Sequence, residues 1–432
     1  MIFQSVELQN FRNHAKTILN LGAGVNILVG DNAQGKTNII EAIYMTCIGR
    51  GFRSPRDRDV IKFGESTAVI KTTAEKRYGK IDIEIMISAP PETTIKNTRG
   101  GSHPPAKQIK INGIPIAKMG ELMGSLMCVF FNPDELKLVK ETPADRRRFM
   151  DIDISQMDKG YFYNLLKYNR ILKQRNALLK NISRTRDEMR SLDIWDEQLA
   201  TVGESITARR VSFCEELREN VTKIHKNFAP TEILDIELEC VGGETNTTHI
   251  GKSHLAVAQS ATRVSQALAN APDTPTHPPT ENCNASPNTR CGSHPLFLDA
   301  LKKARERDLR MRTTTVGCHR DDLAISINGR DVRSFASQGQ QRTVALSLKL
   351  AELAIFERVT GERPILLLDD VFSELDQSRR EKLIELIAPY QSIITATEFA
   401  LDHMPNQRDA QNPSRVAPAM FHVEHGAVTQ ND

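Results

Sequence analysis

The eight residues 30–37, GDNAQGKT, constrain the fold of this 432-residue chain more than any other segment. They match the phosphate-binding loop G-x-x-x-x-G-K-[ST] at every position. The apolar run VNILV at residues 25–29 precedes the loop, and apolar residues at helical spacing follow it over residues 38–45. Strand, glycine loop and helix in this order predict an α/β P-loop fold, because such a loop presents backbone N–H groups and a helix N-terminus to an anion.

The residue types within this loop predict individual contacts to a nucleotide. Gly30 and Gly35 allow the tight turns with which a backbone wraps a triphosphate. Lys36 is expected to reach the β- and γ-phosphates and assist catalysis, and Thr37 to coordinate Mg²⁺ through its hydroxyl. The residues predicted to bind ATP are Gly30, Asp31, Asn32, Ala33, Gln34, Gly35, Lys36 and Thr37.

Two carboxylates follow a second apolar strand at residues 364–370, PILLLDD. Parallel strands place ligand-binding residues at their carboxyl ends, so Asp369 is predicted to hold Mg²⁺. Asp370 is predicted to act catalytically by polarising the attacking water. The alternative is a buried strand that ends in two solvated aspartates. The complete phosphate loop elsewhere in the chain favours the metal and catalytic roles.

The segment SQGQ at residues 337–340 stands directly before a helix predicted over residues 344–359. Small and polar residues at a helix start form an anion site, so Ser337, Gly339 and Gln340 are predicted to contact ATP. The segment resembles the signature motif of ABC-type ATPases. This resemblance implies a site shared between two subunits and therefore an ATP-dependent homodimer. The plain alternative is an ordinary helix cap formed by Ser337.

Further segments resemble the RecF family of SMC-type DNA repair ATPases. They are NFRN at 10–13, FFNPDEL at 130–136, DRRRFMD at 145–151, KQRNALL at 173–179, GCHRDDL at 317–323 and FHV at 421–423. The resemblance implies DNA binding at single-stranded gaps and duplex junctions, support of recombinase loading and SOS induction, and the partners RecR and RecO. Two positions depart from expectation. Cys318 replaces a proline, and Thr397 stands where transporter ATPases place a catalytic histidine, which predicts slow, DNA-dependent hydrolysis.

The order of the motifs predicts an α/β head of the ABC/SMC type, built from both ends of the chain around an inserted helical arm. Residues 1–143 and 296–432 are expected to form the head. Residues 144–295 are expected to form the arm, with a low-complexity insertion at 241–295. Residues 90–107, which contain Pro-Pro and Gly-Gly pairs, are expected to form a loop.

A DNA surface must be local, because the net charge is only +3. The candidates are Lys167, Arg170, Lys173, Arg175, Lys180, Arg184 and Arg186 on the first arm helix, and Arg146, Arg147 and Arg148 before it. The alternative is a solvated helix face. Aromatic residues make up 5% of the chain, so salt-sensitive backbone contact is expected in place of base stacking.

Three further observations bear on location. No signal peptide or membrane-length apolar run is evident, and seven scattered cysteines do not form a disulfide framework, so a cytoplasmic protein without a membrane partner is expected. Two alternative functions remain open. One is the nucleotide-binding subunit of an ABC transporter, which the basic arm and the absent histidine disfavour. The other is an ATP-clamped DNA scaffold without useful turnover.

Overall fold

The computed structural model describes residues 1–54, 56–89, 107–132, 136–183, 185–241, 294–397 and 418–431. These residues fall into two compact units. Unit 1 comprises Met1–Lys159, Glu216–Ile236 and Ile325–Asp432, and unit 2 comprises Gly160–Glu215 and Glu237–Ala324. The predicted loop at 90–107 and insertion at 241–295 lie almost wholly outside the described residues. So do Arg184 and the side chain of Arg186.

Unit 1 contains a largely parallel sheet with the strand order β15-β14-β3-β13-β12-β8. The strands are β3 (Val25–Val29), β8 (Cys128–Phe131), β12 (Ile365–Leu368), β13 (Ser392–Ala396), β14 (Ala419–Glu424) and β15 (Ala427–Asn431). All neighbours pair in parallel except the hairpin β14–β15. The inner strands are almost fully buried, which explains their uninterrupted apolar runs. Strands from both ends of the chain thus form one head, as the fold-class prediction required.

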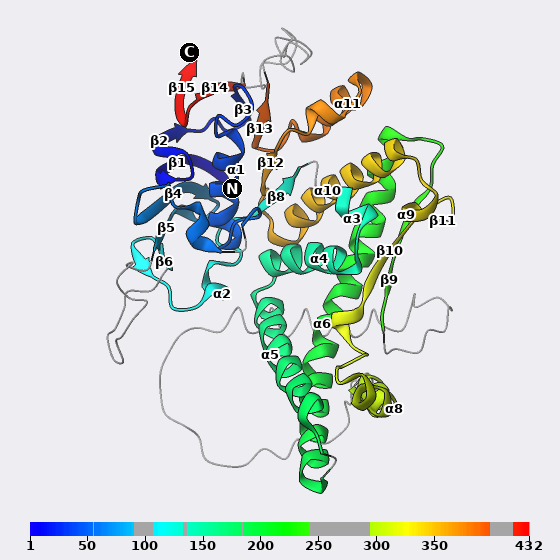
Figure 1. Ribbon diagram of the computed structural model, residues 1–432. Helices are drawn as coiled ribbons and strands as arrows, with labels where there is room; N and C mark the ends of the chain where they lie inside the picture. Colours follow the sequence, from blue (N-terminus) through cyan, green and yellow to red (C-terminus); the bar gives the residue numbers. More distant parts are fainter. Residues whose placement is uncertain are drawn as a thin grey trace. The chain divides into compact units, whose positions relative to one another are not determined.

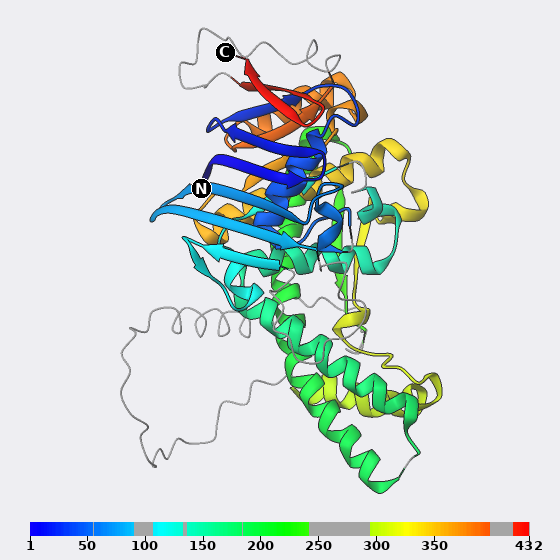
Figure 2. The same cartoon turned by 60° about the vertical axis from the view of Figure 1, so that its left-hand side comes forward.

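A second, antiparallel sheet of unit 1 has the order β2-β1-β4-β5-β6-β7. Its strands are β1 (Ile2–Phe11), β2 (His14–Asn20), β4 (Thr67–Lys76), β5 (Gly79–Ser88), β6 (Lys107–Ile111) and β7 (Ile114–Pro115). Helix α1 (Lys36–Ile48) packs between the two sheets (Figure 1, Figure 2), and the three elements share one apolar core. Eleven of its 13 residues are buried, among them the polar Lys36, Glu41 and Thr46.

Several further helices belong to unit 1. The long helix α10 (Gln338–Thr360) packs against β8 and against α3 and α4, the two helices that follow β8 in the sequence. Helix α4 starts at Pro143 and belongs to unit 1, although its residues were assigned to the arm from sequence. These helices are α2 (Met119–Leu122), α3 (Leu136–Lys140), α4 (Pro143–Met157), α9 (Val332–Phe335) and α11 (Gln377–Ile387), with the 3₁₀ turns η1 (Asp57–Val60) and η5 (Phe372–Glu374).

Unit 2 is mainly helical. It contains α5 (Lys159–Asn181) almost entirely, the first part of α6 (Arg186–Phe228), α8 (His294–Met311) and the 3₁₀ turn η4 (Cys318–Arg320). A small sheet has the order β11-β10-β9, from β9 (Leu234–Glu239), β10 (Asp322–Ile327) and β11 (Arg330–Asp331). Strand β11 belongs to unit 1, and β9 and β10 belong only in part to unit 2. Asn328 and Gly329 form the turn of the hairpin β10–β11, and both residues have positive φ. Within the described part of the chain, no helix has the length and apolarity needed to cross a bilayer.

Candidate nucleotide-binding site

The phosphate loop connects β3 to α1 and requires glycine at two positions. Gly30 has φ 151° and Gly35 has φ 118°. A Cβ atom on Gly30 would lie 2.2 Å from the carbonyl oxygen of Val423, and one on Gly35 would lie 2.7 Å from the side chain of Asn13. Both positions therefore exclude larger residues on conformational and steric grounds. The tight loop that the motif predicts is present.

Two turns outside the motif hold this loop in place. The side-chain Nδ2 of Asn13, in the β1–β2 turn, donates to the carbonyl oxygen of Gln34 at 2.7 Å. The backbone N–H of Gly426, in the β14–β15 turn, donates to the same oxygen at 3.0 Å. Buried His14 places Nε2 3.2 Å from the carbonyl oxygen of Gly35, and burial lowers the pKa of its ring. The first and last turns of the head thus fix the loop from outside, a role that the sequence alone did not indicate.

Lys36 folds back over the loop that precedes it. Its ammonium group donates to the carbonyl oxygens of Gly30 and Asp31, the latter at 2.7 Å. Burial lowers the pKa of Lys36, while Asp370, Asp31 and Asp369 act in the opposite direction. The ammonium is thus held beside the loop by neutral acceptors. A phosphate oxygen would be a stronger partner, because its negative charge attracts the ammonium more strongly than the partial charge of a carbonyl oxygen does.

Thr37 and Asp369 meet across the sheet, as their predicted shared role requires. The Thr37 hydroxyl donates to Asp369 Oδ1 at 2.8 Å, and the Thr395 hydroxyl donates to the same oxygen at 2.9 Å. Strand β13 lies between β3 and β12, so the topology places Thr395 between the two motifs. Burial raises the pKa of Asp369, and the two hydroxyl donors oppose this shift. A hydroxyl and a carboxylate side by side are oxygen donors of the kind that Mg²⁺ prefers.

Asp370 has a strained backbone and an exposed side chain. Its φ is 53°, which is uncommon for a residue other than glycine. Two hydrogen bonds hold this conformation. Its backbone N–H donates to the Thr395 hydroxyl at 2.8 Å, and its carbonyl oxygen accepts from the Ser373 hydroxyl at 2.8 Å. Strain of this kind persists where the surrounding structure over-determines it, often at functional sites. Here it turns the carboxylate toward the cavity beside the loop.

This cavity has a volume of about 320 Å³, within the range of small-molecule sites. Its lining residues are Asn32, Ala33, Gln34, Gly35, Lys36, Thr37, Asn38, Arg53, Asp369, Asp370, Thr395 and Thr397. Arg53 was not among the site residues predicted from the sequence. Its Nη1 donates to the Asn38 side chain at 3.2 Å, and it is the one arginine among the described lining residues. The arginine-rich run RGFRSPRDR at residues 50–58 was the available signal.

The signature segment lies elsewhere on unit 1. Ser337, Gly339 and Gln340 are not among the described residues that line the cavity. Ser337 is exposed and caps α10: its hydroxyl accepts from the backbone N–H of Gln340 at 3.3 Å, and the Gln340 side chain accepts from its backbone N–H at 2.8 Å. The Ser337 helix cap that was the alternative prediction is therefore present. It leaves the first N–H groups of the helix without an intrahelical acceptor and so available to an anion.

Comparison with known proteins decides the family. The family model "RecF/RecN/SMC N terminal domain" matches residues 2–411. The "DNA replication and repair protein RecF" of Agathobacter rectalis is 37% identical over 428 residues, which cover 99% of this chain and 99% of that protein. The chain belongs to the RecF family of DNA replication and repair proteins. The family predicted from the sequence is thereby confirmed, and membership of it decides against the transporter alternative.

Solved structures agree with this family assignment. The "Structure of the recombination mediator protein RecF-ATP in RecFOR pathway" matches with a TM-score of 0.77 and 31% identity, over 100% of this chain and 98% of that one. The "Crystal structure of the SmcHead bound to the C-winged helix domain of ScpA" matches with a TM-score of 0.51 and 14% identity, over 100% and 97%. The second match concerns the fold alone. Together they confirm the predicted ABC/SMC-type head.

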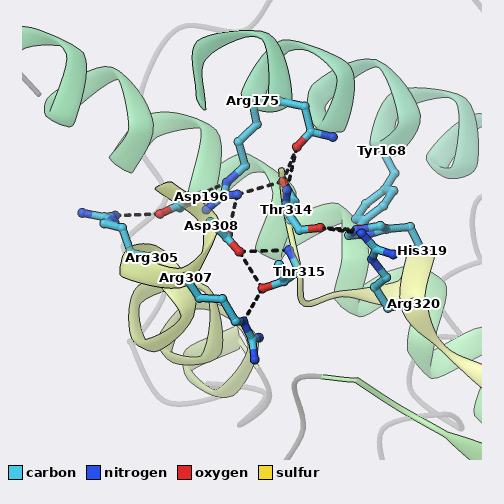
Figure 3. A network of polar contacts seen from close by, with 11 residues as sticks. Tyr168, Arg175, Asp196, Arg305, Arg307, Asp308, Thr314, Thr315, His319 and Arg320 are labelled. Carbon is cyan, nitrogen blue, oxygen red and sulfur yellow. Dashed lines mark hydrogen bonds and ion pairs between the residues drawn. The ribbon is translucent and has the colours of Figure 1, made fainter. Parts of the chain in front are cut away.

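Two RecF-like segments, KQRNALL and GCHRDDL, meet inside unit 2 (Figure 3). Arg175 is fully buried and donates to Asp196 at 2.6 Å, to Asp308 at 2.7 Å and to Thr314 at 2.8 Å. The side chain of Asn176 accepts from the backbone N–H of Thr314 at 2.8 Å. The first segment thereby fixes the loop that leads into the second. We call Arg175, Asp196, Asp308 and Thr314 the arm cluster.

The second segment continues the same network. His319 places Nδ1 2.8 Å from the Tyr168 hydroxyl and Nε2 3.2 Å from the carbonyl oxygen of Thr314 (Figure 3). Buried Arg210 donates to the carbonyl oxygen of Cys318 and to Asp321. These residues bind one another, and none of them lines either of the two described cavities. Both family segments therefore contribute to one internal polar network of this unit.

Burial removes two of the predicted DNA contacts. Arg175 has no exposed surface and Arg146 is 5% exposed, so neither guanidinium reaches a phosphate on the surface. These two predictions were wrong, because a basic stripe in a sequence does not show which side chains are buried by ion pairs and helix packing. The candidates that remain exposed are Lys167, Arg170, Lys173, Lys180 and Arg148, with Arg147 half-buried.

Proposed function

We propose that this chain binds ATP with Mg²⁺ in the cavity of unit 1, and that ATP joins two copies into a dimer that binds DNA at single-stranded gaps. The observation that carries the proposal is the meeting of Thr37 and Asp369 beside a glycine loop whose residues 32–37 line the same cavity. A phosphate chain and a divalent cation are the ligands that this donor set fits.

Individual residues take distinct parts in this proposal. Backbone N–H groups of residues 32–37 and the N-terminus of α1 receive the phosphates. Lys36 exchanges its carbonyl partners for phosphate oxygens. The Thr37 hydroxyl and Asp369 hold Mg²⁺, which neutralises charge on the β- and γ-phosphates. Arg53, which lines the same cavity as Lys36, adds a second positive charge near Asp369.

Hydrolysis in this site is proposed to be slow. Asp370 is the candidate general base, since its carboxylate faces the cavity from a backbone held by Thr395 and Ser373. Thr397 lines the cavity where transporter ATPases place a histidine. A measurement of single-turnover hydrolysis separates the two remaining functions, a slow ATPase and an ATP clamp without useful turnover. Replacement of Asp370 by Asn should abolish turnover and leave ATP binding intact. A pure ATP clamp would show the same low rate in both proteins.

The proposed dimer completes the site with the signature of a second copy. Ser337, Gly339 and Gln340 lie outside the cavity of their own chain, and the N-terminus of α10 is open to an anion. Sedimentation velocity with and without ATP tests this on wild type, Lys36→Met and Ser337→Arg. We expect ATP-dependent dimers in wild type and monomers in both variants, because one lacks the phosphate contact and the other blocks the shared site. ATP-independent monomers of wild type would contradict the proposal.

DNA and protein partners follow from the family and the exposed cations. A solved relative is described as a mediator "in RecFOR pathway", so RecR and RecO are the proposed partners, in the cytoplasm. Lys167, Arg170, Lys173 and Lys180 give α5 an exposed basic side. Binding to gapped DNA should weaken steeply with salt, because each neutralised phosphate releases counterions. Binding through phosphate contacts weakens strongly between about 50 and 200 mM salt. A constant affinity over this range would contradict contact with the DNA backbone.

A further inference from the structure

A chain of side chains joins the end of α6 to the signature segment within unit 1. His225, in the last turn of α6, is fully buried, with Nδ1 3.0 Å from Ser347 Oγ and Nε2 3.1 Å from Glu232 Oε2. The other oxygen of Glu232 accepts from Gln340 Nε2 at 3.0 Å. Gln340 itself accepts from the backbone N–H of Ser337 at 2.8 Å. We call His225, Glu232 and Gln340 the relay.

The local backbone explains how Glu232 comes to lie between the other two. Helix α6 ends at Phe228, and the backbone N–H of Ala229 still donates to the carbonyl oxygen of His225 at 2.9 Å. The N–H of Glu232 then donates to the carbonyl oxygen of Ala229 at 3.1 Å. The chain therefore turns back over the end of the helix. Its carboxylate reaches both His225 and the start of α10.

Ser347, His225 and Glu232 have the order of a serine, base and acid in hydrolases, but they have no catalytic access. Ser347 and His225 are both without exposed surface. The Ser347 hydroxyl also donates to the carbonyl oxygen of Thr343, one turn earlier in α10. No substrate can reach a nucleophile inside this helix. The contribution of these groups is to hold positions.

Glu232 is the member that accepts hydrogen bonds from both neighbours. Burial lowers the pKa of His225, and Glu232 opposes this shift. A neutral ring with its proton on Nε2 donates to one carboxylate oxygen while Gln340 donates to the other, and the Ser347 hydroxyl then donates to Nδ1 in place of Thr343. Gln340 is in turn tied at both ends of its carboxamide, to Glu232 and to Ser337. Loss of the Glu232 carboxylate would therefore remove the hydrogen bond that ties the Gln340 side chain to the turn after α6.

We infer that Glu232 is a positioning residue for the signature segment, which fixes the Ser337 cap before a second copy arrives. The inference rests on the proposed function, in which that cap contacts the ATP of the partner. An ordered cap lowers the conformational cost of dimerisation, because less freedom is lost on association. The end of the arm helix α6 thereby takes part in forming the shared site.

Glutamine at position 232 provides a rescue that alanine does not. Its Oε1 can accept from Gln340, and its Nε2 can donate to Nε2 of a His225 ring that carries its proton on Nδ1. That proton would be donated to Ser347 Oγ, and the Ser347 hydroxyl would then donate to the carbonyl oxygen of Thr343. The relay then persists without charge. Alanine removes both hydrogen bonds.

The matched control is Glu219→Ala. Glu219 lies on α6 six residues before His225, is exposed, and forms no hydrogen bond or ion pair with any side chain that the structure describes. Sedimentation velocity over a protein concentration series with saturating ATP measures dimerisation of the full chain. Glu232→Ala should dimerise about tenfold more weakly, as the loss of a charged hydrogen bond gives on the order of 1.4 kcal/mol or more. Glu232→Gln and Glu219→Ala should stay within about threefold of wild type.

A second readout is independent of dimerisation. Amide hydrogen exchange of the nucleotide-free protein should quicken at Ser337 and Gln340 in Glu232→Ala and stay unchanged in Glu232→Gln. Unchanged dimerisation and exchange in Glu232→Ala would overturn the inference, and so would a Gln variant as defective as the Ala variant. If wild type and Ser337→Arg show the same response to ATP, the proposed function fails instead. The exchange measurement still decides whether Glu232 positions the cap.

Discussion

The phosphate loop of unit 1 and the arm cluster of unit 2 both collect charged residues from distant parts of the sequence, but they arrange them in opposite ways. In the loop, the Lys36 ammonium is bonded only to neutral carbonyl groups, and the exposed Asp370 carboxylate faces a cavity. In the arm cluster, Arg175 is fully buried and two carboxylates and a hydroxyl surround it. The phosphate loop leaves charge available to a ligand, whereas the charged groups of the arm cluster are paired with one another.

A segment shared with a family can therefore serve internal pairing as well as ligand binding. The loop has strained backbone, glycine contacts and carbonyl-bound cations, all of which a phosphate would relieve or exploit. The arm cluster has none of these features. Its charges pair inside the unit, and a buried pair of this type becomes costly only when one partner is removed. The two regions should therefore respond to mutation through different observables.

The largest expected effect is on stability, in the arm cluster. Replacement of Arg175 by Ala leaves Asp196 and Asp308 buried without their cation and should lower the free energy of unfolding by about 3–5 kcal/mol. Chemical denaturation followed by circular dichroism measures this change. Replacement of Arg170, which is exposed on the same helix, serves as the control and should change stability little. A protein of normal stability that has lost ATP affinity would contradict the comparison.

The next effect is on ligand binding, in the phosphate loop. Lys36→Ala should weaken ATP binding about 10- to 100-fold, since a hydrogen bond to a charged group contributes about 1.5–3 kcal/mol. Calorimetric titration measures the affinity, and the free energy of unfolding without nucleotide should stay near that of wild type. Lys16→Ala, on the exposed side of β2, is the matched control. Equal affinities for both variants would refute the assignment of Lys36.

A smaller effect concerns the metal. Removal of Mg²⁺ with a chelator should weaken ATP binding to wild type, because the cation bridges phosphate oxygens to the Thr37 and Asp369 oxygens. Thr37→Val removes the hydroxyl at similar volume and should abolish most of that Mg²⁺-dependent difference. Affinity in the presence of chelator should be nearly the same in both proteins. A variant that keeps the full response to Mg²⁺ would exclude Thr37 as a ligand.

The smallest effect is a pH dependence of stability. Burial raises the pKa of Asp369 above its ordinary value of 3.8, so ionisation of this group opposes folding. The folded state binds the Asp369 proton more tightly than the unfolded state does. The stability that this proton contributes is fully present below the unfolded pKa of Asp369 and is lost as pH rises through its folded pKa. Asp369→Asn should therefore raise the thermal midpoint of the nucleotide-free protein at pH 7. The difference should vanish near pH 3.5, about where the unfolded group is itself protonated.

Much of the fold and the nucleotide site could be predicted from local pattern. The residues of the phosphate loop, the paired aspartates and the helix after the signature are specified by contiguous segments whose spacing has a physical reason. The role of Arg53 could not be predicted, because nothing local fixes where an exposed arginine points. The roles of Asn13 and Gly426 depend on strand order, since β1, β2, β14 and β15 come from opposite ends of the chain.

The P-loop class and the family could be predicted from the amino-acid sequence, because backbone geometry in a glycine loop depends on neighbours in the chain. Which charges remain available depends on tertiary packing. It buried Arg175 and Arg146, brought Thr395 to Asp369, and tied Gln340 to the end of α6 through Glu232. The physical reason is that burial and ion pairing are properties of packed surfaces formed by distant segments, which no local pattern records.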